Sequence, residues 1–237
     1  MNIQYNALWT DQGTTADFDF KIFVENRIGY RSGVKKDQLF TNELTSGALK
    51  RTVDAWENIE ITSKLYLNGA TEKQISRLIV FLESAKYVGD YDSDLCYKVY
   101  RVKIKSEDED LFDSQSLEVT WEVESVKYEK SLQKYTVDNL PEIENDGTHI
   151  AYPIITVTGV ASTQTTIRIN EQEFYLWKVD DKVTIDCREH LQNCYDKLGL
   201  PKNQLMRGNF PHLDVGTNKI TVSNGLRYSL EYMKRWR

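Results

Sequence analysis

Short segments with β-strand character, separated by turn residues, fill residues 150–237 and limit how this chain can fold. Segments such as "PIITVTGV", "TTIRIN" and "NKITV" are rich in β-branched residues and lie between Gly, Asn, Ser and Pro. Short strands with turn residues every 8–12 positions are typical of an antiparallel sandwich or jelly roll. We therefore expect this half to be a β-sandwich, interrupted at residues 188–199 by a short helix that ends at Gly199.

The N-terminal half shows longer strand patterns and one helix. Residues 59–69 alternate apolar and polar positions before Asn-Gly, which predicts a half-buried strand. Apolar residues then recur at helical spacing over 71–87, and Thr71 with Gln74 forms a capping-box pattern. We expect one α-helix here, over residues 71–87, within a mainly β protein.

Two further strands are predicted at residues 95–104 and 117–126, with the acidic segment 106–113 as the loop between them. The second strand carries four apolar residues on one face: Leu117, Val119, Trp121 and Val123.

A change in charge suggests two domains. Residues 1–130 hold 17 Lys and Arg against 23 Asp and Glu, whereas residues 131–237 hold 13 of each. We therefore expect an N-terminal domain over 1–130, a linker over 131–144 and a C-terminal domain over 145–237. The acidic balance argues against nucleic-acid wrapping, since phosphate contacts need a basic surface.

No segment reaches the ~18–20 apolar residues of a membrane helix, and no signal-peptide pattern opens the chain. The three cysteines are too few for a disulfide framework, which fits a reducing cytoplasm. We expect no membrane partner.

Possible metal and catalytic patterns are incomplete. Asp90, Asp92 and Asp94 have the spacing of a calcium loop, but Leu95 replaces its glycine and Arg101 its final Glu, so a solvated turn is the better interpretation.

Three other reactive residues lie close in sequence: Cys187, His190 and Cys194. A zinc site would need a fourth ligand or an open position, and a cysteine nucleophile would need a third, orienting group. No pair of carboxylates can be assigned to glycoside hydrolysis. We therefore expect no catalytic residues, no metal and no cofactor.

The glycine-rich segment "GNFPHLDVGTNKITVSNG", residues 208–225, leads into a strand and ends in a hairpin signal. It has no Lys-Ser/Thr pair and no following helix, so it does not match a phosphate-binding loop. We expect Gly208, Gly216 and Gly225 to have positive φ or to lie where a Cβ would not fit, with Pro211 fixing the turn.

The order of these segments resembles the distal tail protein (Dit) family of long-tailed, non-contractile bacteriophages (siphophages), especially those of Gram-positive hosts. The C-terminal half carries most of the resemblance, from "NDGTHIAYPIITVTG" through "TIRINEQEFYL", "VTIDC" and the glycine-rich segment to a terminal "KRWR". "WENIEITSKLYL", "FLESA" and "LEVTWEVESVKY" match more loosely. The matching positions are Asn145, Gly147, Thr148, Pro153, Asp186, Gly208, Phe210, Pro211, Leu213, Gly216, Asn218, Trp236 and Arg237.

The resemblance implies a virion protein at the distal end of the tail, with an N-terminal β domain that forms a homo-hexameric ring and a C-terminal galectin-like β-sandwich. The ring would be the adsorption hub, joining the tail tube protein to a tail-tip or fibre protein and a receptor-binding protein. Duplex DNA would pass through its lumen without specific binding. The predicted structural turn motif comprises Gly208, Phe210, Pro211, Leu213, Gly216, Asn218 and Gly225, the last of which comes from the hairpin signal and not from the resemblance.

Some members of that family carry inserted carbohydrate-binding modules, for which we expect no room in 237 residues. The galectin sugar motif His-x-Asn is absent, because none of His149, His190 and His212 has Asn two positions later. The alternative function, a carbohydrate-binding adhesion module, would depend on exposed aromatic residues such as Tyr175 and Trp177.

Overall fold

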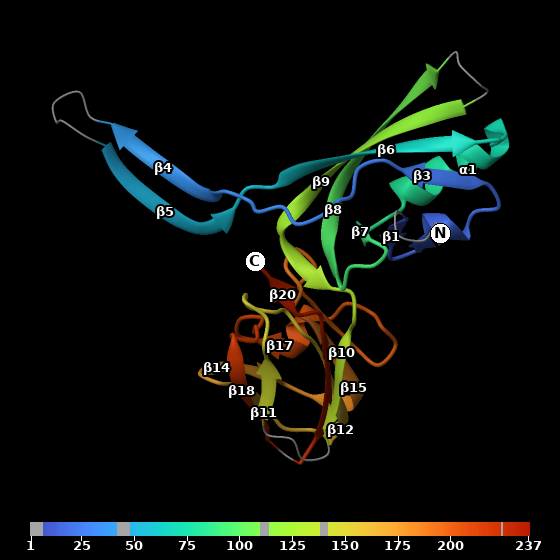
Figure 1. Cartoon of the computed structure of the whole chain (residues 1–237). Coiled ribbons are helices and arrows are strands. Elements are labelled where there is room, and N and C mark those ends of the chain that lie inside the picture. Colours follow the sequence, from blue (N-terminus) through green and yellow to red (C-terminus); the bar gives the residue numbers. More distant parts are fainter. Residues whose placement is uncertain (1–6, 42–47, 110–113, 138–141, 224) are drawn as a thin grey trace. The chain divides into compact units, whose positions relative to one another are not determined.

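A computed structural model describes residues 7–41, 48–109, 114–137, 142–223 and 225–237. The fold is mainly β, and the described residues contain one α-helix. The chain divides into two compact units (Figure 1): Met1–Tyr128 with Arg237, and Glu129–Trp236.

The first unit is built on one large sheet. Its strand order is β2-β1-β7-β8-β9-β6-β3. Apolar residues of β6 and β9 point to the same buried cluster, because Ile61 is paired with Trp121 and Leu65 with Leu117. The predicted inward face of residues 117–126 is confirmed, since Leu117, Val119, Trp121 and Val123 are all buried. The bounds are β1 Leu8–Thr10, β2 Gly13–Thr14, β3 Lys21–Val24, β6 Ile59–Asn68, β7 Tyr87–Asp90, β8 Leu95–Glu109 and β9 Ser114–Glu129, with a short 3-10 helix η2 at Thr15–Asp17.

The α-helix α1, Glu72–Glu83, follows β6 and buries Leu78 and Leu82. Its predicted capping box is confirmed, with the Thr71 hydroxyl accepting from the Gln74 amide and the Thr71 amide donating to the Gln74 side chain at 2.8 Å. The helix ends before residue 87, where it was expected to end, because Tyr87 already belongs to β7 and pairs with β8.

Two strands of this unit form a separate hairpin. β4, Lys35–Thr41, pairs with β5, Ala48–Trp56, in a two-stranded sheet (Figure 1).

The acidic loop expected over 106–113 is shorter than predicted. β8 continues to Glu109 and β9 begins at Ser114, while residues 110–113 lie outside the described part of the chain. The two strands therefore extend further into the acidic segment than the sequence predicts.

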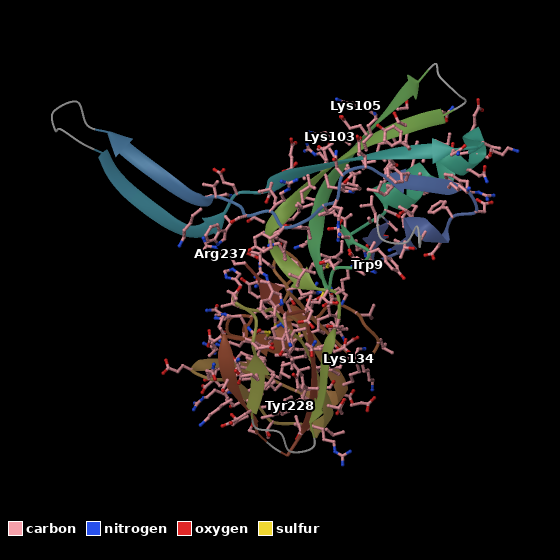
Figure 2. All side chains as sticks on the ribbon, viewed as in Figure 1. Trp9, Lys103, Lys105, Lys134, Tyr228 and Arg237 are labelled. Atoms are coloured by element: carbon pink, nitrogen blue, oxygen red, sulfur yellow. The ribbon has the colours of Figure 1, made fainter. Side chains whose placement is uncertain are left out.

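Ion pairs cross the outward side of β6, β8 and β9. Lys103 lies 3.0 Å from Glu60, and Lys105 lies 3.6 Å from Glu118; the two lysines are labelled in Figure 2. Exposed pairs of this kind contribute little to stability, on the order of 0–1 kcal/mol each. They do mean that part of the acidic charge in this unit is neutralised locally.

The second unit contains two five-stranded sheets that enclose one hydrophobic core. Their strand orders are β10-β19-β12-β15-β16 and β11-β18-β13-β14-β17. Core residues come from both sheets, for example Leu230 and Ile155 from one and Ile167 and Phe174 from the other. The bounds are β10 Gln133–Val137, β11 Glu142–Asn145, β12 Ile154–Ala161, β13 Thr165–Ile169, β14 Gln172–Leu176, β15 Val179–Asp186, β16 Asn193–Tyr195, β17 Met206–Arg207, β18 Gly216–Val222, β19 Arg227–Tyr232 and β20 Arg235–Trp236, with a 3-10 helix η3 at Asn203–Leu205.

The predicted linker over 131–144 is wrong, because most of it is part of the second unit's sheets. β10 pairs with β19, and β11 pairs with β18. Tyr135 stacks on Tyr232 with ring centroids 6.0 Å apart, and Ile143 is buried in the core.

The predicted helix over 188–199 is also wrong. The segment consists of turns around the short strand β16, which places Cys194 in the core opposite Ile185. The Asp196 carboxylate accepts hydrogen bonds from the amides of Leu198 and Leu200 at 2.9 and 3.0 Å, which favours a turn over a helix. Gly199 has a φ of 76° in that turn.

Candidate functional site

The predicted turn motif begins in the connection between β17 and β18, continues into β18 with Gly216 and Asn218, and ends with Gly225 between β18 and β19. Gly208 has a φ of 110°, Gly216 a φ of 91° and Gly225 a φ of 62°. A Cβ on Gly208 would also lie 3.0 Å from the Cβ of Phe174. These backbone conformations suit glycine, because other L-residues adopt positive φ only at a cost.

Hydrophobic residues of the same segment anchor it in the core. Leu213 is fully buried, Pro211 is buried, and Phe210 packs against the core from its edge. Leu213 and Ala151 exchange two backbone hydrogen bonds of 2.8 and 3.0 Å. The segment is therefore attached to the sandwich by packing and by an isolated β-bridge.

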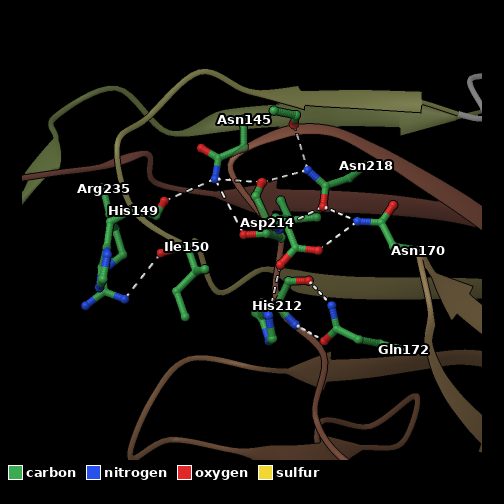
Figure 3. A network of polar contacts seen from close by, with 11 residues as sticks. Asn145, His149, Ile150, Asn170, Gln172, His212, Asp214, Asn218 and Arg235 are labelled. Carbon is green, nitrogen blue, oxygen red and sulfur yellow. Dashed lines mark hydrogen bonds and ion pairs between the residues drawn. The ribbon is translucent and has the colours of Figure 1, made fainter. Parts of the chain in front are cut away.

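A buried asparagine, Asn218, holds the turn from the start of β18 (Figure 3). Its side-chain oxygen accepts from the Asp214 amide at 2.8 Å, and its side-chain nitrogen donates to the carbonyls of Asp214 and Gly216 at 2.9 Å each. One amide side chain thus satisfies three backbone groups of the turn.

A second buried asparagine, Asn145 at the end of β11, contacts the same turn from the other side. Its nitrogen donates to the carbonyls of His149 and Asp214 at 3.2 Å each. Its oxygen accepts from the Gly147 amide at 3.3 Å. Gly147 has to be small, because a Cβ there would lie 2.6 Å from the carbonyl oxygen of Arg235.

The hairpin between β13 and β14 completes the network. Asn170, with a φ of 51°, donates to the Asp214 carboxylate at 2.9 Å and to the Asn218 side chain at 3.1 Å. Gln172 exchanges two hydrogen bonds of 2.9 Å with the backbone of His212. These residues were not identified from the sequence, although Asn in a two-residue hairpin connection is a recognisable signal for positive φ.

The contacts of this network support a structural role. Its amide side chains mostly bind backbone donors and acceptors of the turn, and an amide is neither a general base nor a nucleophile. The ionisable pair at its edge, His212 and Asp214, is 3.2 Å apart and partly exposed. We infer that the turn motif fixes the path of the chain between β17 and β18, two strands of the same sheet.

Replacing Gly208 or Gly216 with Ala is expected to destabilise the second unit. We expect a loss of about 1 kcal/mol for Gly216→Ala, from backbone conformation alone, and a larger loss for Gly208→Ala, where the new methyl group also meets Phe174. Urea unfolding of both variants measures the difference. Equal stability of Gly216→Ala and the parent chain would contradict a required positive φ.

The aspartates of the calcium-like pattern have other roles. Asp90 accepts from the amides of Ile28 and Gly29 at 2.9 and 2.8 Å, and Asp92 pairs with Arg27. In the described part of the chain, no group of three or more His, Cys, Asp or Glu is arranged to hold a metal ion.

The cysteine and histidine pattern does not form a site either. Cys187 and Cys194 are buried, whereas His190 is exposed. Burial raises the pKa of the Cys187 thiol far above its usual range and that of Cys194 to about 11. Thiols with such pKa values remain protonated at neutral pH, so they are poor nucleophiles and metal ligands.

The aromatic residues of the alternative hypothesis lie on and beside β14. Trp177 is 47% exposed, while the Tyr175 hydroxyl donates to Glu173, which also binds Arg168. The Glu173 pKa is lowered by the hydrogen bonds from Tyr175 and Arg168. Trp177 therefore offers an apolar surface. The polar groups of Tyr175, Glu173 and Arg168, by contrast, are hydrogen-bonded to one another.

No helix among the described residues is long and apolar enough to cross a membrane.

Comparison with known proteins gives a likeness in structure. No protein-family model matches the chain, and no curated protein matches its sequence significantly. Among solved structures, the Dit protein of phage SPP1 is similar with a TM-score of 0.67 and 10% sequence identity, over 98% of this chain and 99% of that one. That protein is described as a paradigm of the hub adsorption apparatus in phages that infect Gram-positive bacteria. The chain has the fold of a phage tail hub protein.

Proposed function

We propose that this protein is a structural component of a siphophage tail tip and belongs to the distal tail protein family. The observation that carries the proposal is the shared fold over almost the full length of both chains. The ordered sequence motifs of the C-terminal half support it independently, because a pattern of residues and a shared fold are separate observations.

The described residues also favour a scaffold over an enzyme. The buried polar side chains Asn145 and Asn218 hold backbone turns, and the buried cysteines carry raised pKa values.

In this proposal the chain forms a homo-hexameric ring through residues 1–130, between the tail tube protein and a tip or fibre protein with its receptor-binding protein. The galectin-like sandwich points outward as a docking scaffold. Ring closure requires a contact between two different surfaces of the same unit. β2 and β3, at the two ends of the first unit's sheet, are edges suited to such a contact. The acidic balance of residues 1–130 would help duplex DNA to pass without binding.

Electron microscopy and light scattering of the purified full chain test the proposal. Six copies of 27.6 kDa give a ring of about 166 kDa with six-fold symmetry. A fragment of residues 129–237, which retains all strands of the second unit, is expected to stay monomeric. If the fragment itself forms hexamers, the ring interface lies in the second unit, which contradicts the assignment to residues 1–130. A full chain that stays monomeric at high concentration and is not incorporated into tails would contradict the hub function.

One observation favours a second candidate function, a carbohydrate-binding adhesion module. Trp177 exposes 47% of its surface beside a sheet, and aromatic faces of this kind can stack on sugar rings. A glycan array with the parent chain and Trp177→Ala distinguishes the two functions. Glycan binding that is lost in the variant would support the adhesion module, and its absence in both favours the scaffold.

A further inference from the structure

A buried lysine of the first unit has no hydrogen-bond partner among the described residues. Lys127 lies near the end of β9 and is only 2% exposed. Its Nζ atom has no hydrogen-bond acceptor among the described residues. It continues the inward face of the strand beyond Val123 and Ser125. An ammonium group has three donors, and burying it without acceptors is costly.

A cavity of about 210 Å³ lies beside this lysine. Tyr30 and Arg27 line it with half or more of their surfaces exposed, so the opening lies on their side. The Lys127 Nζ atom is 3.0 Å from the centre of the Tyr30 ring and 5.6 Å from that of Tyr97. These aromatic faces stabilise a cation but supply no hydrogen-bond acceptor in line with the amine.

The wall of the cavity is held in place by specific contacts. The Asp90 carboxylate accepts from the amides of Ile28 and Gly29, and the Tyr97 hydroxyl accepts from the Arg31 amide at 2.7 Å. Gly29 has a φ of 59°, so the loop turns sharply at the cavity. The arrangement is therefore a built pocket rather than a gap between strands.

We propose that this pocket binds a carboxylate group, which accepts hydrogen bonds from the Lys127 ammonium. The charges of the pocket favour a monoanion. Arg27 already pairs with Asp92 and lies 3.7 Å from Asp90, whereas the Lys127 ammonium has no hydrogen-bond partner among the described residues, so one further negative charge is enough to neutralise it. A phosphate dianion would leave an excess of negative charge next to Asp90. The remaining lining includes Ile28, Leu95 and the tyrosine rings, which suits a short hydrocarbon tail.

The carboxylate has two potential sources: a small free acid, or an acidic side chain of another protein chain in the assembly. Calorimetric titration of the full chain with propionate, and with propionamide as the neutral isostere, tests the first source. We expect propionate alone to bind, Lys127→Met to abolish binding, and Lys73→Met, at an exposed lysine of α1, to leave it unchanged. Propionate affinity is expected to fall about tenfold between pH 6 and pH 9, because burial lowers the pKa of Lys127 to about 8.

Carbodiimide coupling of the full chain, in mixed isotope-labelled copies and in assembled tails, tests the second source. An amide between Lys127 and an Asp or Glu of a different chain, suppressed by excess propionate, identifies a protein carboxylate. The proposal is overturned if propionate and propionamide behave alike and Lys127 is coupled to no other chain. This result does not depend on ring formation, so it leaves the proposed function unaffected.

Discussion

Asn218→Ala is expected to destabilise the second unit by about 3–4 kcal/mol. The substitution removes one side chain that satisfies the amide of Asp214 and the carbonyls of Asp214 and Gly216, at distances of 2.8–2.9 Å. Asn218 is fully buried, so water does not replace these contacts freely. Each buried polar group left without a partner costs about 1–3 kcal/mol.

Urea unfolding followed by tryptophan fluorescence measures the loss, and Asn209→Ala is the matched control. Asn209 lies in the same connection but is exposed, so its replacement is expected to change stability by less than ~0.5 kcal/mol. A loss below about 1 kcal/mol for Asn218→Ala would mean that the turn does not depend on this side chain. Asn145→Ala is expected to behave like Asn218→Ala, because it binds the same Asp214 carbonyl.

The sequence predicts the mainly β fold because local patterns carry the relevant physics. Alternation along β9 sets which side chains are buried, and Thr71 with Gln74 marks the start of α1. Positive φ at Gly208, Gly216 and Gly225 follows from the same local reasoning, since glycine adopts such backbone conformations without strain.

Non-local pairing could not be predicted in this way. Residues 133–137 look like a linker because only Tyr135 and Val137 are apolar, and they become a strand through pairing with β19, almost a hundred positions later. Cys194 likewise belongs to β16 because β15 is its neighbour. In both cases the tertiary partner overrides a weak local preference.

The polar network was not predicted, for a related reason. Asn145, Gly147 and Asn218 were named only as positions that match the family resemblance, and Asn170 and Gln172 contact the turn across the sheet. The buried Lys127 was missed although a signal exists. The alternation through Val119, Trp121 and Val123 extends two further steps to Lys127, which places a lysine on the inward face.

Lys127→Met is expected to stabilise the first unit by about 2 kcal/mol at pH 7. Burial lowers the pKa of Lys127 from 10.5 to about 8, so the folded protein disfavours the ammonium group. Each unit of pKa difference corresponds to about 1.4 kcal/mol between the two protonation states, and part of that is offset by the contact with Tyr30. Methionine keeps the apolar stem of the side chain without the charge.

The dependence on pH distinguishes this cause from better packing. Between about pH 8 and pH 10.5 the folded chain binds fewer protons than the unfolded chain, so the parent protein's free energy of unfolding rises with pH. Below about pH 8 the penalty for the buried charge is fully present. The advantage of Lys127→Met is therefore expected to be largest at pH 7 and to shrink toward zero near pH 10.5, while Lys73→Met shows no such trend. A constant advantage at all pH values would assign the gain to packing.

If propionate binds as proposed, its addition at pH 7 stabilises the parent chain but not Lys127→Met. The difference in free energy of unfolding between the two chains then becomes smaller, because the ligand supplies the acceptor that the buried ammonium lacks.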